Sequence, residues 1–77
     1  MNDALEPRFD VEVALDLDGP DGNVFVVIGA VKSAIRRSGG TEDDVRDYRA
    51  AVMAGDYENA LKVTRETVRL VDLGGAR

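Results

Sequence analysis

The sequence predicts an α+β fold, with one amphipathic strand near the N-terminus followed by three short helices. Three observations support this fold class. Apolar and polar or small residues alternate without a break from residue 9 to residue 17, which is typical of a strand with one buried face. Three later segments carry apolar residues at helical spacing, and each follows a residue of the type that caps helices. With 77 residues, the chain (1–77) makes a single domain.

The strand is the first element that we expect, after a flexible arm over residues 1–7. A lone strand leaves its backbone groups unpaired and needs a partner strand. Three sources of that partner stay open: residues 69–73 if the last helix stops early, a hairpin through residues 24–28, or a second copy of the chain. We favour a homodimer whose sheet crosses a two-fold axis. Its strand-pairing residues would be Phe9, Val11, Val13 and Leu15.

The segment after the turn at residues 18–22 admits two interpretations. The β-branched residues from 24 to 28 are typical of the second strand of a hairpin. Alternatively, Asn23 caps a helix that runs to Ser38. We favour the helix because the apolar residues recur at helical spacing. In addition, two arginines followed by Gly39 stand where a helix end favours cations and a glycine.

Two further helices are predicted from their start signals. Thr41 is a natural N-cap, acidic residues fill the first turn after it, and Asp44 stands where a capping box places its second residue. Asp56 caps the last helix, whose apolar stripe extends to Val71. We expect the glycine-rich tail, residues 74–77, to fray.

The composition argues against an enzyme. The chain has no cysteine and no histidine, so disulfides, zinc–thiolate sites, cysteine nucleophiles and the usual general base are excluded. We therefore predict no catalytic residue, no metal site and no cofactor. No apolar stretch approaches the roughly 20 residues of a membrane span, and the N-terminus does not resemble a signal peptide. A cytoplasmic protein is the expectation.

Negative charge is concentrated in the first 22 residues. They carry seven acidic residues and one basic residue, a net of −6, whereas residues 23–77 carry eight acidic and nine basic residues, a net of +1. A nucleic acid is an unsuitable direct partner for such a surface, because its phosphates need clustered Lys and Arg. A protein with a basic surface is a suitable partner. The predicted partner-binding residues are Asp10, Glu12, Asp16, Asp18 and Asp21.

An alternative function is a small ligand- or metal-binding module that uses the loop 16–23. Counted from Asp16, the calcium-loop pattern fails, because position 5 is Pro20, position 6 is Asp21 and position 12 is Val27. The same acids oppose a bound phosphate. A polar turn followed by a helix cap explains these residues equally well.

Two stretches resemble a set of small phage and prophage proteins. They are Asp21-Gly-Asn-Val-Phe-Val-Val-Ile-Gly-Ala-Val and Ala54-Gly-Asp-Tyr-Glu-Asn-Ala-Leu61. In that set a strand ends in Asp-x-x-Gly-Asn-x-Phe, a helix follows, and Ser/Ala-Gly-Asp-Tyr opens the last helix. The resemblance implies a helix, not a hairpin, after Asn23. By size and setting it also suggests an anti-CRISPR-like inhibitor of host defence, which would bind a host complex at a basic, nucleic-acid-binding surface.

Overall fold

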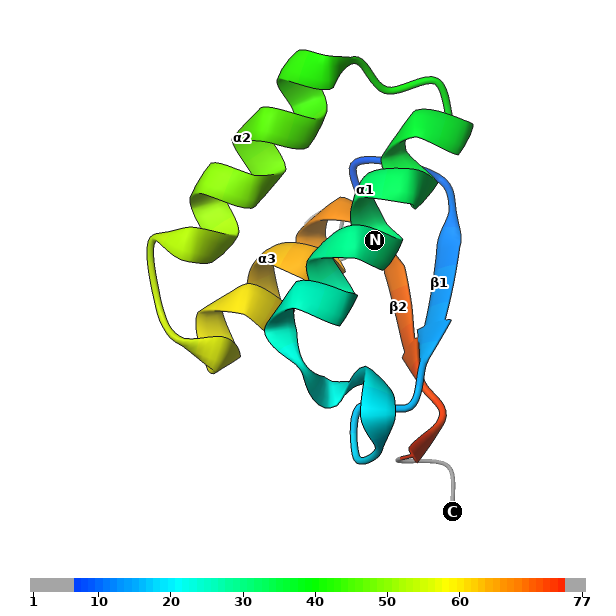
Figure 1. Ribbon diagram of the computed structural model, residues 1–77. Coiled ribbons are helices and arrows are strands. Elements are labelled where there is room, and N and C mark those ends of the chain that lie inside the picture. Colours follow the sequence, from blue (N-terminus) through cyan, green and yellow to red (C-terminus); the bar gives the residue numbers. More distant parts are fainter. Residues whose placement is uncertain (1–6, 75–77) are drawn as a thin grey trace, which may run out of the picture.

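The computed structural model describes residues 7–74 of the chain (Figure 1). It confirms the α+β class. In chain order the elements are β1 (Glu12–Leu15), the 3₁₀ turn η2 (Pro20–Gly22), α1 (Val24–Arg37), α2 (Glu42–Met53), α3 (Tyr57–Thr67) and β2 (Arg69–Asp72). Most of the predicted arm at residues 1–7 lies outside the described residues.

The strands β1 and β2 lie side by side as a parallel sheet, and all three helices form the connection between them (Figure 1). The register pairs Glu12 with Arg69 and Leu15 with Asp72. Parallel strands need a long connection, which the helices supply. The segment 69–73 is therefore the strand partner, one of the three sources that the sequence left open.

Two boundaries differ from the sequence prediction. The regular strand covers four residues, not 9–17, although Phe9 still donates its N–H to the Thr67 carbonyl (2.9 Å). The last helix ends at Thr67, and Val68 already has extended backbone angles (φ −139°, ψ 166°). The prediction of a helical stripe reaching Val71 was therefore wrong. Pairing satisfies the backbone groups on the facing edges of β1 and of residues 69–72.

Each helix begins at the cap that the sequence predicted, and the helix interpretation after the turn is confirmed. The Asn23 side chain accepts the Phe25 N–H (2.8 Å) at the start of α1. Thr41 Oγ1 accepts the Asp44 N–H (3.1 Å), while the Asp44 carboxylate accepts the Thr41 N–H (2.8 Å), which completes the capping box of α2. The Asp56 side chain accepts the Asn59 N–H (2.9 Å) at the start of α3. These bonds satisfy backbone donors that would otherwise be orphaned.

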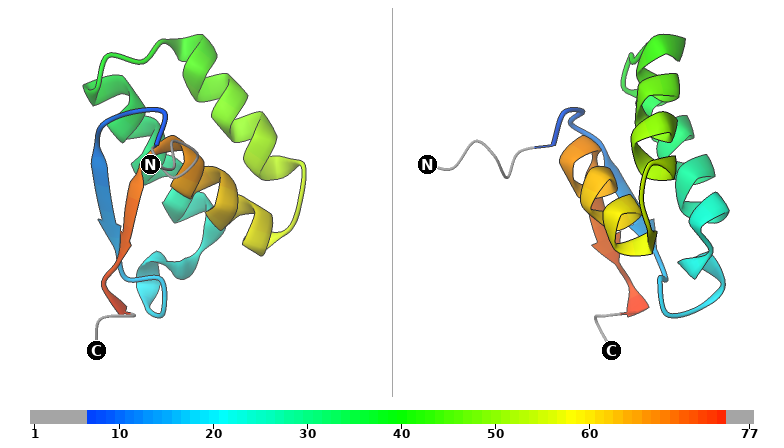
Figure 2. Two further views of the ribbon diagram at one scale, coloured as in Figure 1. Left: turned by 180° about the vertical axis from the view of Figure 1, so that it is seen from behind. Right: turned by 90° about the vertical axis from the view of Figure 1, so that its left-hand side faces the viewer.

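The core lies between the inner face of the sheet and the helices. α1 and α3 contact the strands, whereas α2 packs outside them on α1 and α3 (Figure 2). Inward-facing Val13 and Leu15 of β1 are buried, but Ala14 of β1 and Val71 of β2 face outward and are exposed. The outer face of the sheet is therefore open to solvent. The buried apolar residues are Val13, Leu15, Val27, Ile28, Val31, Ala34, Ile35, Val45, Tyr48, Val52, Ala60 and Val68.

Candidate functional site

The five acidic residues predicted to bind a partner fall into two groups in the structure. Asp10 and Glu12 are exposed at the start of β1. Asp16, Asp18 and Asp21 follow the other end of β1, in the loop that passes through η2 to α1. Of these three, Asp18 is exposed, while the other two are half-buried.

The first group is covered in part by an arginine from β2. The Arg69 guanidinium forms an ion pair with Asp10, and the register places Glu12 directly opposite Arg69. The hydrogen bond from Arg69, with its positive charge, lowers the pKa of Asp10. Asp10 therefore stays ionised, and the positive charge of Arg69 balances one of the two negative charges of Asp10 and Glu12. This contact could not be predicted from the sequence, because no local pattern connects residues so far apart in the chain.

The second group holds the loop together. The Asp16 N–H donates to Asp21 Oδ2 (3.0 Å), and the Gly19 N–H donates to the Asp16 carbonyl (3.1 Å). A Cβ at Gly22 would stand 2.4 Å from the Leu17 carbonyl oxygen, so this position requires glycine. Because it accepts the Asp16 N–H, the Asp21 carboxylate stabilises the turn.

Asp72, at the end of β2, joins the same end of the sheet. Its Oδ1 accepts the N–H groups of Leu17 (3.2 Å) and Gly74 (3.0 Å). Gly74 is buried, and a Cβ there would stand 2.6 Å from Asp16 Oδ1 and 2.9 Å from Asp18 Oδ2. The tail predicted to fray thus begins with a packed residue; the remainder, 75–77, lies outside the described part of the chain.

The loop does not have the geometry of a metal site. Within residues 7–74, no group of three or more acidic side chains is placed to hold a metal ion. Carboxylates of the loop region instead accept backbone N–H groups, as at Asp21 and Asp72. The alternative of a metal-binding module at residues 16–23 therefore gains no support from the structure.

The residues predicted to pair strands do so within the chain. Val11 accepts the Arg69 N–H (2.9 Å), and Leu15 accepts the Leu73 N–H (2.8 Å). The side chains of Val13 and Leu15 are buried in the chain's own core, and Phe9 packs against it. The homodimer stays a prediction, but the need for a strand partner no longer argues for it.

The residues of the two phage-like motifs have two different roles. Asn23 and Asp56 are helix caps, so their polar side chains are structural. The aromatic residues beside them are exposed: Phe25 retains 66% and Tyr57 40% of its accessible surface. Tyr57 lies at the surface, in the first turn of α3.

Several basic residues form exposed ion pairs with acidic side chains. Arg36 makes two bonds to Glu42 (2.8 and 2.9 Å), which lower the pKa of that carboxyl. Arg8 makes a single bond to Asp44 (2.5 Å). Another exposed pair joins Arg46 to Asp43. These are local ion pairs on solvent-exposed helix faces, and each contributes little to stability.

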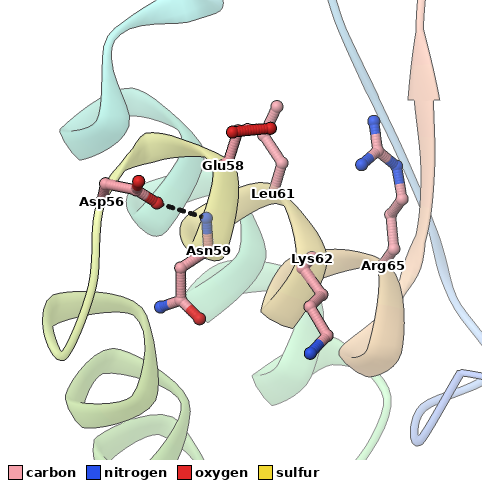
Figure 3. A pocket seen from close by; sticks show the side chains of 6 residues that line it. All are labelled: Asp56, Glu58, Asn59, Leu61, Lys62 and Arg65. Carbon is pink, nitrogen blue, oxygen red and sulfur yellow. Dashed lines mark hydrogen bonds between the residues drawn. The ribbon is translucent and has the colours of Figure 1, made fainter.

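A shallow depression of about 600 Å³ lies along α3 (Figure 3). All its lining residues come from this one helix and its cap: Asp56, Glu58, Asn59, Leu61, Lys62 and Arg65. Two of them are acidic and two are basic, and Asp56 is engaged with the Asn59 N–H (2.9 Å). Ligand pockets enclose most of the ligand, so this open helix face is not a ligand site.

No protein-family model matches the chain, and comparisons with curated proteins and with solved structures found no significant match. The resemblance to small phage proteins therefore rests on the two sequence motifs. None of the helices in residues 7–74 has both the length and the apolar character needed to cross a membrane.

Proposed function

We propose that the protein is a non-enzymatic inhibitor of phage or prophage origin, of the anti-CRISPR type, that binds a host protein complex in the cytoplasm. Its acidic N-terminal region would occupy a basic surface on which the complex normally holds nucleic acid. The proposal also includes a homodimer, formed through a surface other than the paired edge of β1 and β2.

The observation that carries this proposal is the placement of the exposed carboxylates. Asp10, Glu12 and Asp18 are exposed along β1 and the loop that follows it, and Arg69 is paired with the first of them. We call these three residues the acidic face. Exposed charges of one sign at the two ends of a strand attract a surface of the opposite charge and raise its association rate. Lys and Arg that bind phosphates therefore suit this face.

The first test removes the acidic face and compares it with a matched loss of charge elsewhere. The test variant combines Asp10→Ser, Glu12→Ser and Asp18→Ser. The control combines Asp47→Ser, Glu58→Ser and Glu66→Ser, three exposed acids on the helices. Both change the net charge by three.

Pull-down and titration against purified CRISPR effector complexes measure the result. We expect the test variant to bind about tenfold more weakly or worse, as electrostatic steering predicts, with the control nearly unchanged. Arg69→Ser should act in the opposite direction and tighten binding, because it unmasks Asp10. Equal losses in the two triple variants would refute the acidic face as the binding surface.

The second test concerns competition. If the protein occupies a nucleic-acid groove, labelled RNA or DNA is displaced from the complex as the protein is added. Added salt should weaken the interaction, because screening acts on exposed charges. A stable ternary complex of effector, nucleic acid and this protein would overturn the proposed mechanism.

A further inference from the structure

The outer edge of β1 is the side of the strand that faces away from β2. Figures 1 and 2 show β1 at the margin of the described residues, with no other element beside that edge, and the sheet contains only these two strands. The backbone hydrogen bonds toward the β2 segment are made by odd-numbered residues, as Val11 and Leu15 show. Because alternate residues of a parallel ladder face opposite sides, the N–H and C=O groups of Glu12 and Ala14 point outward.

An edge with unpaired backbone groups is a template for another strand unless the protein blocks it. The common blocking devices include lysine, proline and a bulge. Between Glu12 and Leu15 the chain has no lysine and no proline, and each β1 residue has a single partner in the register. Lysine, proline and a bulge are therefore absent from residues 12–15, and the one charged side chain there, Glu12, restricts which further strand can pair.

The charges along this edge identify the chemistry of the added strand. The exposed side chains at its even positions are Asp10, Glu12 and Ala14, and Asp16 follows. Pairing with a second copy would bring acids close to acids, and like charges directly opposite each other destabilise a sheet. Opposite charges stabilise it, so a strand with basic side chains at alternate positions fits this edge.

We infer that the outer edge of β1 accepts an extended, basic segment of the partner protein as an additional strand of the sheet. Backbone hydrogen bonds to Glu12 and Ala14 supply affinity, and the acidic side chains select Lys or Arg in the added strand. This inference rests on the proposed function and specifies how the acidic face would be recognised.

The first experiment blocks the edge without changing its charge. Ala14→Pro removes the outward N–H, and proline is tolerated where the N–H faces solvent. Ala14→Val is the matched control, because it keeps that N–H in place. The probes are a ten-residue peptide of alternating Val and Lys and the same alternation of Val and Glu. Circular dichroism and thermal melting establish that each variant is folded.

We expect the Val/Lys peptide to bind the parent protein and Ala14→Val alike, and to bind Ala14→Pro at least about tenfold more weakly, the equivalent of one lost backbone hydrogen bond. The Val/Glu peptide should not bind. Equal binding of the Val/Lys peptide to the proline and valine variants would refute strand addition.

Amide hydrogen exchange tests strand addition at the outer edge of β1 without any substitution. In the free protein the Glu12 and Ala14 amides should exchange quickly, while those of Val13 and Leu15 are protected by β2. Addition of the Val/Lys peptide should slow the first two. No slowing would overturn the inference, and slowing with protein concentration alone would assign the edge to a second copy instead.

The effector complex separates this inference from the proposed function. If Ala14→Pro binds the effector normally while the acidic-face variant does not, the strand inference fails and the proposed function stands. If the Val/Lys peptide adds to β1 but no effector binds, the proposed function fails and the edge remains a strand-binding site.

Discussion

At the scale of single residues, the main polar contact of the core is the pair Tyr48–Thr64. The Tyr48 hydroxyl lies 2.7 Å from Thr64 Oγ1, and Thr64 Oγ1 donates to the Ala60 carbonyl (2.8 Å). Since the threonine hydroxyl has one hydrogen, Tyr48 must be the donor to it. This bond joins α2 to α3 inside an apolar core, where an unpaired hydroxyl is costly.

The two partners of this bond should therefore differ in their mutational cost. Thr64→Val leaves the Tyr48 hydroxyl buried without an acceptor and should lower the free energy of unfolding by about 1–3 kcal/mol. Tyr48→Phe leaves the Thr64 donation intact and should cost only about 0.5–1.5 kcal/mol. Urea denaturation of both single variants and the double variant measures these costs. A Tyr48→Phe cost larger than that of Thr64→Val would contradict this assignment of donor and acceptor.

The same tyrosine makes stability depend on pH in the alkaline range. Burial raises the pKa of Tyr48 above its ordinary value of 10.0, because the apolar core disfavours the charged phenolate. The unfolded chain therefore loses its proton first, so the contribution is complete below pH 10 and is lost as pH rises through the folded pKa. Unfolding free energies at pH 8 to 11 should fall less steeply for Tyr48→Phe than for the parent. Parallel curves would refute the shift.

At the scale of elements, two glycines that look alike in the sequence have opposite roles. Gly22 ends the loop before α1, where a Cβ would stand 2.4 Å from the Leu17 carbonyl oxygen. Gly29 lies inside α1, where a Cβ would meet nothing within 4 Å. The first glycine is required by a close backbone approach, and the second only weakens its helix.

Alanine at these two positions should therefore change stability in opposite directions. Gly22→Ala should destabilise the protein by about 1–3 kcal/mol, because a rigid backbone atom must move. Gly29→Ala should stabilise it by up to about 1 kcal/mol through helix propensity. Thermal and urea unfolding of the two variants measure the difference. A stable Gly22→Ala variant would mean that the turn has another conformation in solution.

At the scale of the whole molecule, the pairing of β1 with β2 closes the fold. It joins residues near the start of the described chain to residues near its end, as in the bond from the Arg69 N–H to the Val11 carbonyl (2.9 Å). A homodimer would have to use a different surface from this occupied edge. Sedimentation of the free protein at micromolar concentration tests it, since a single monomeric species would refute the dimer.

The ending of α3 can be tested by comparing two neighbouring residues of β2. In the strand, Leu70 packs against the core while Val71 is 38% exposed. If α3 continued, Val71 would instead lie on the buried stripe. We expect Leu70→Ala to cost roughly 2 kcal/mol, at the low end for leucine truncation, and Val71→Ala to stay within about 0.5 kcal/mol. The reverse order in urea denaturation would indicate a helix.

Features that depend on residues close together in the chain could be predicted from the amino-acid sequence. Helix starts were readable at Asn23, Thr41 and Asp56, because a cap bonds to an N–H two or three residues away. The strand showed through the two-residue alternation of its buried side chains. The concentration of negative charge near the N-terminus was also plain, since it needs only counting.

The strand register, the end of α3 and the roles of the acidic residues depend on contacts between distant segments, so only the folded structure shows them. Arg69 forms an ion pair with Asp10 and lies opposite Glu12 in the strand register. No local sequence pattern encodes that register. In the sequence, the apolar stripe of α3 continues at helical spacing to Val71. In the structure, α3 ends at Thr67 and residues 69–72 pair with β1 instead, which satisfies backbone groups of both strands. The acidic set was divided for the same reason. Asp21 and Asp72 bind backbone N–H groups in the folded loop region, which leaves Asp10, Glu12 and Asp18 facing solvent.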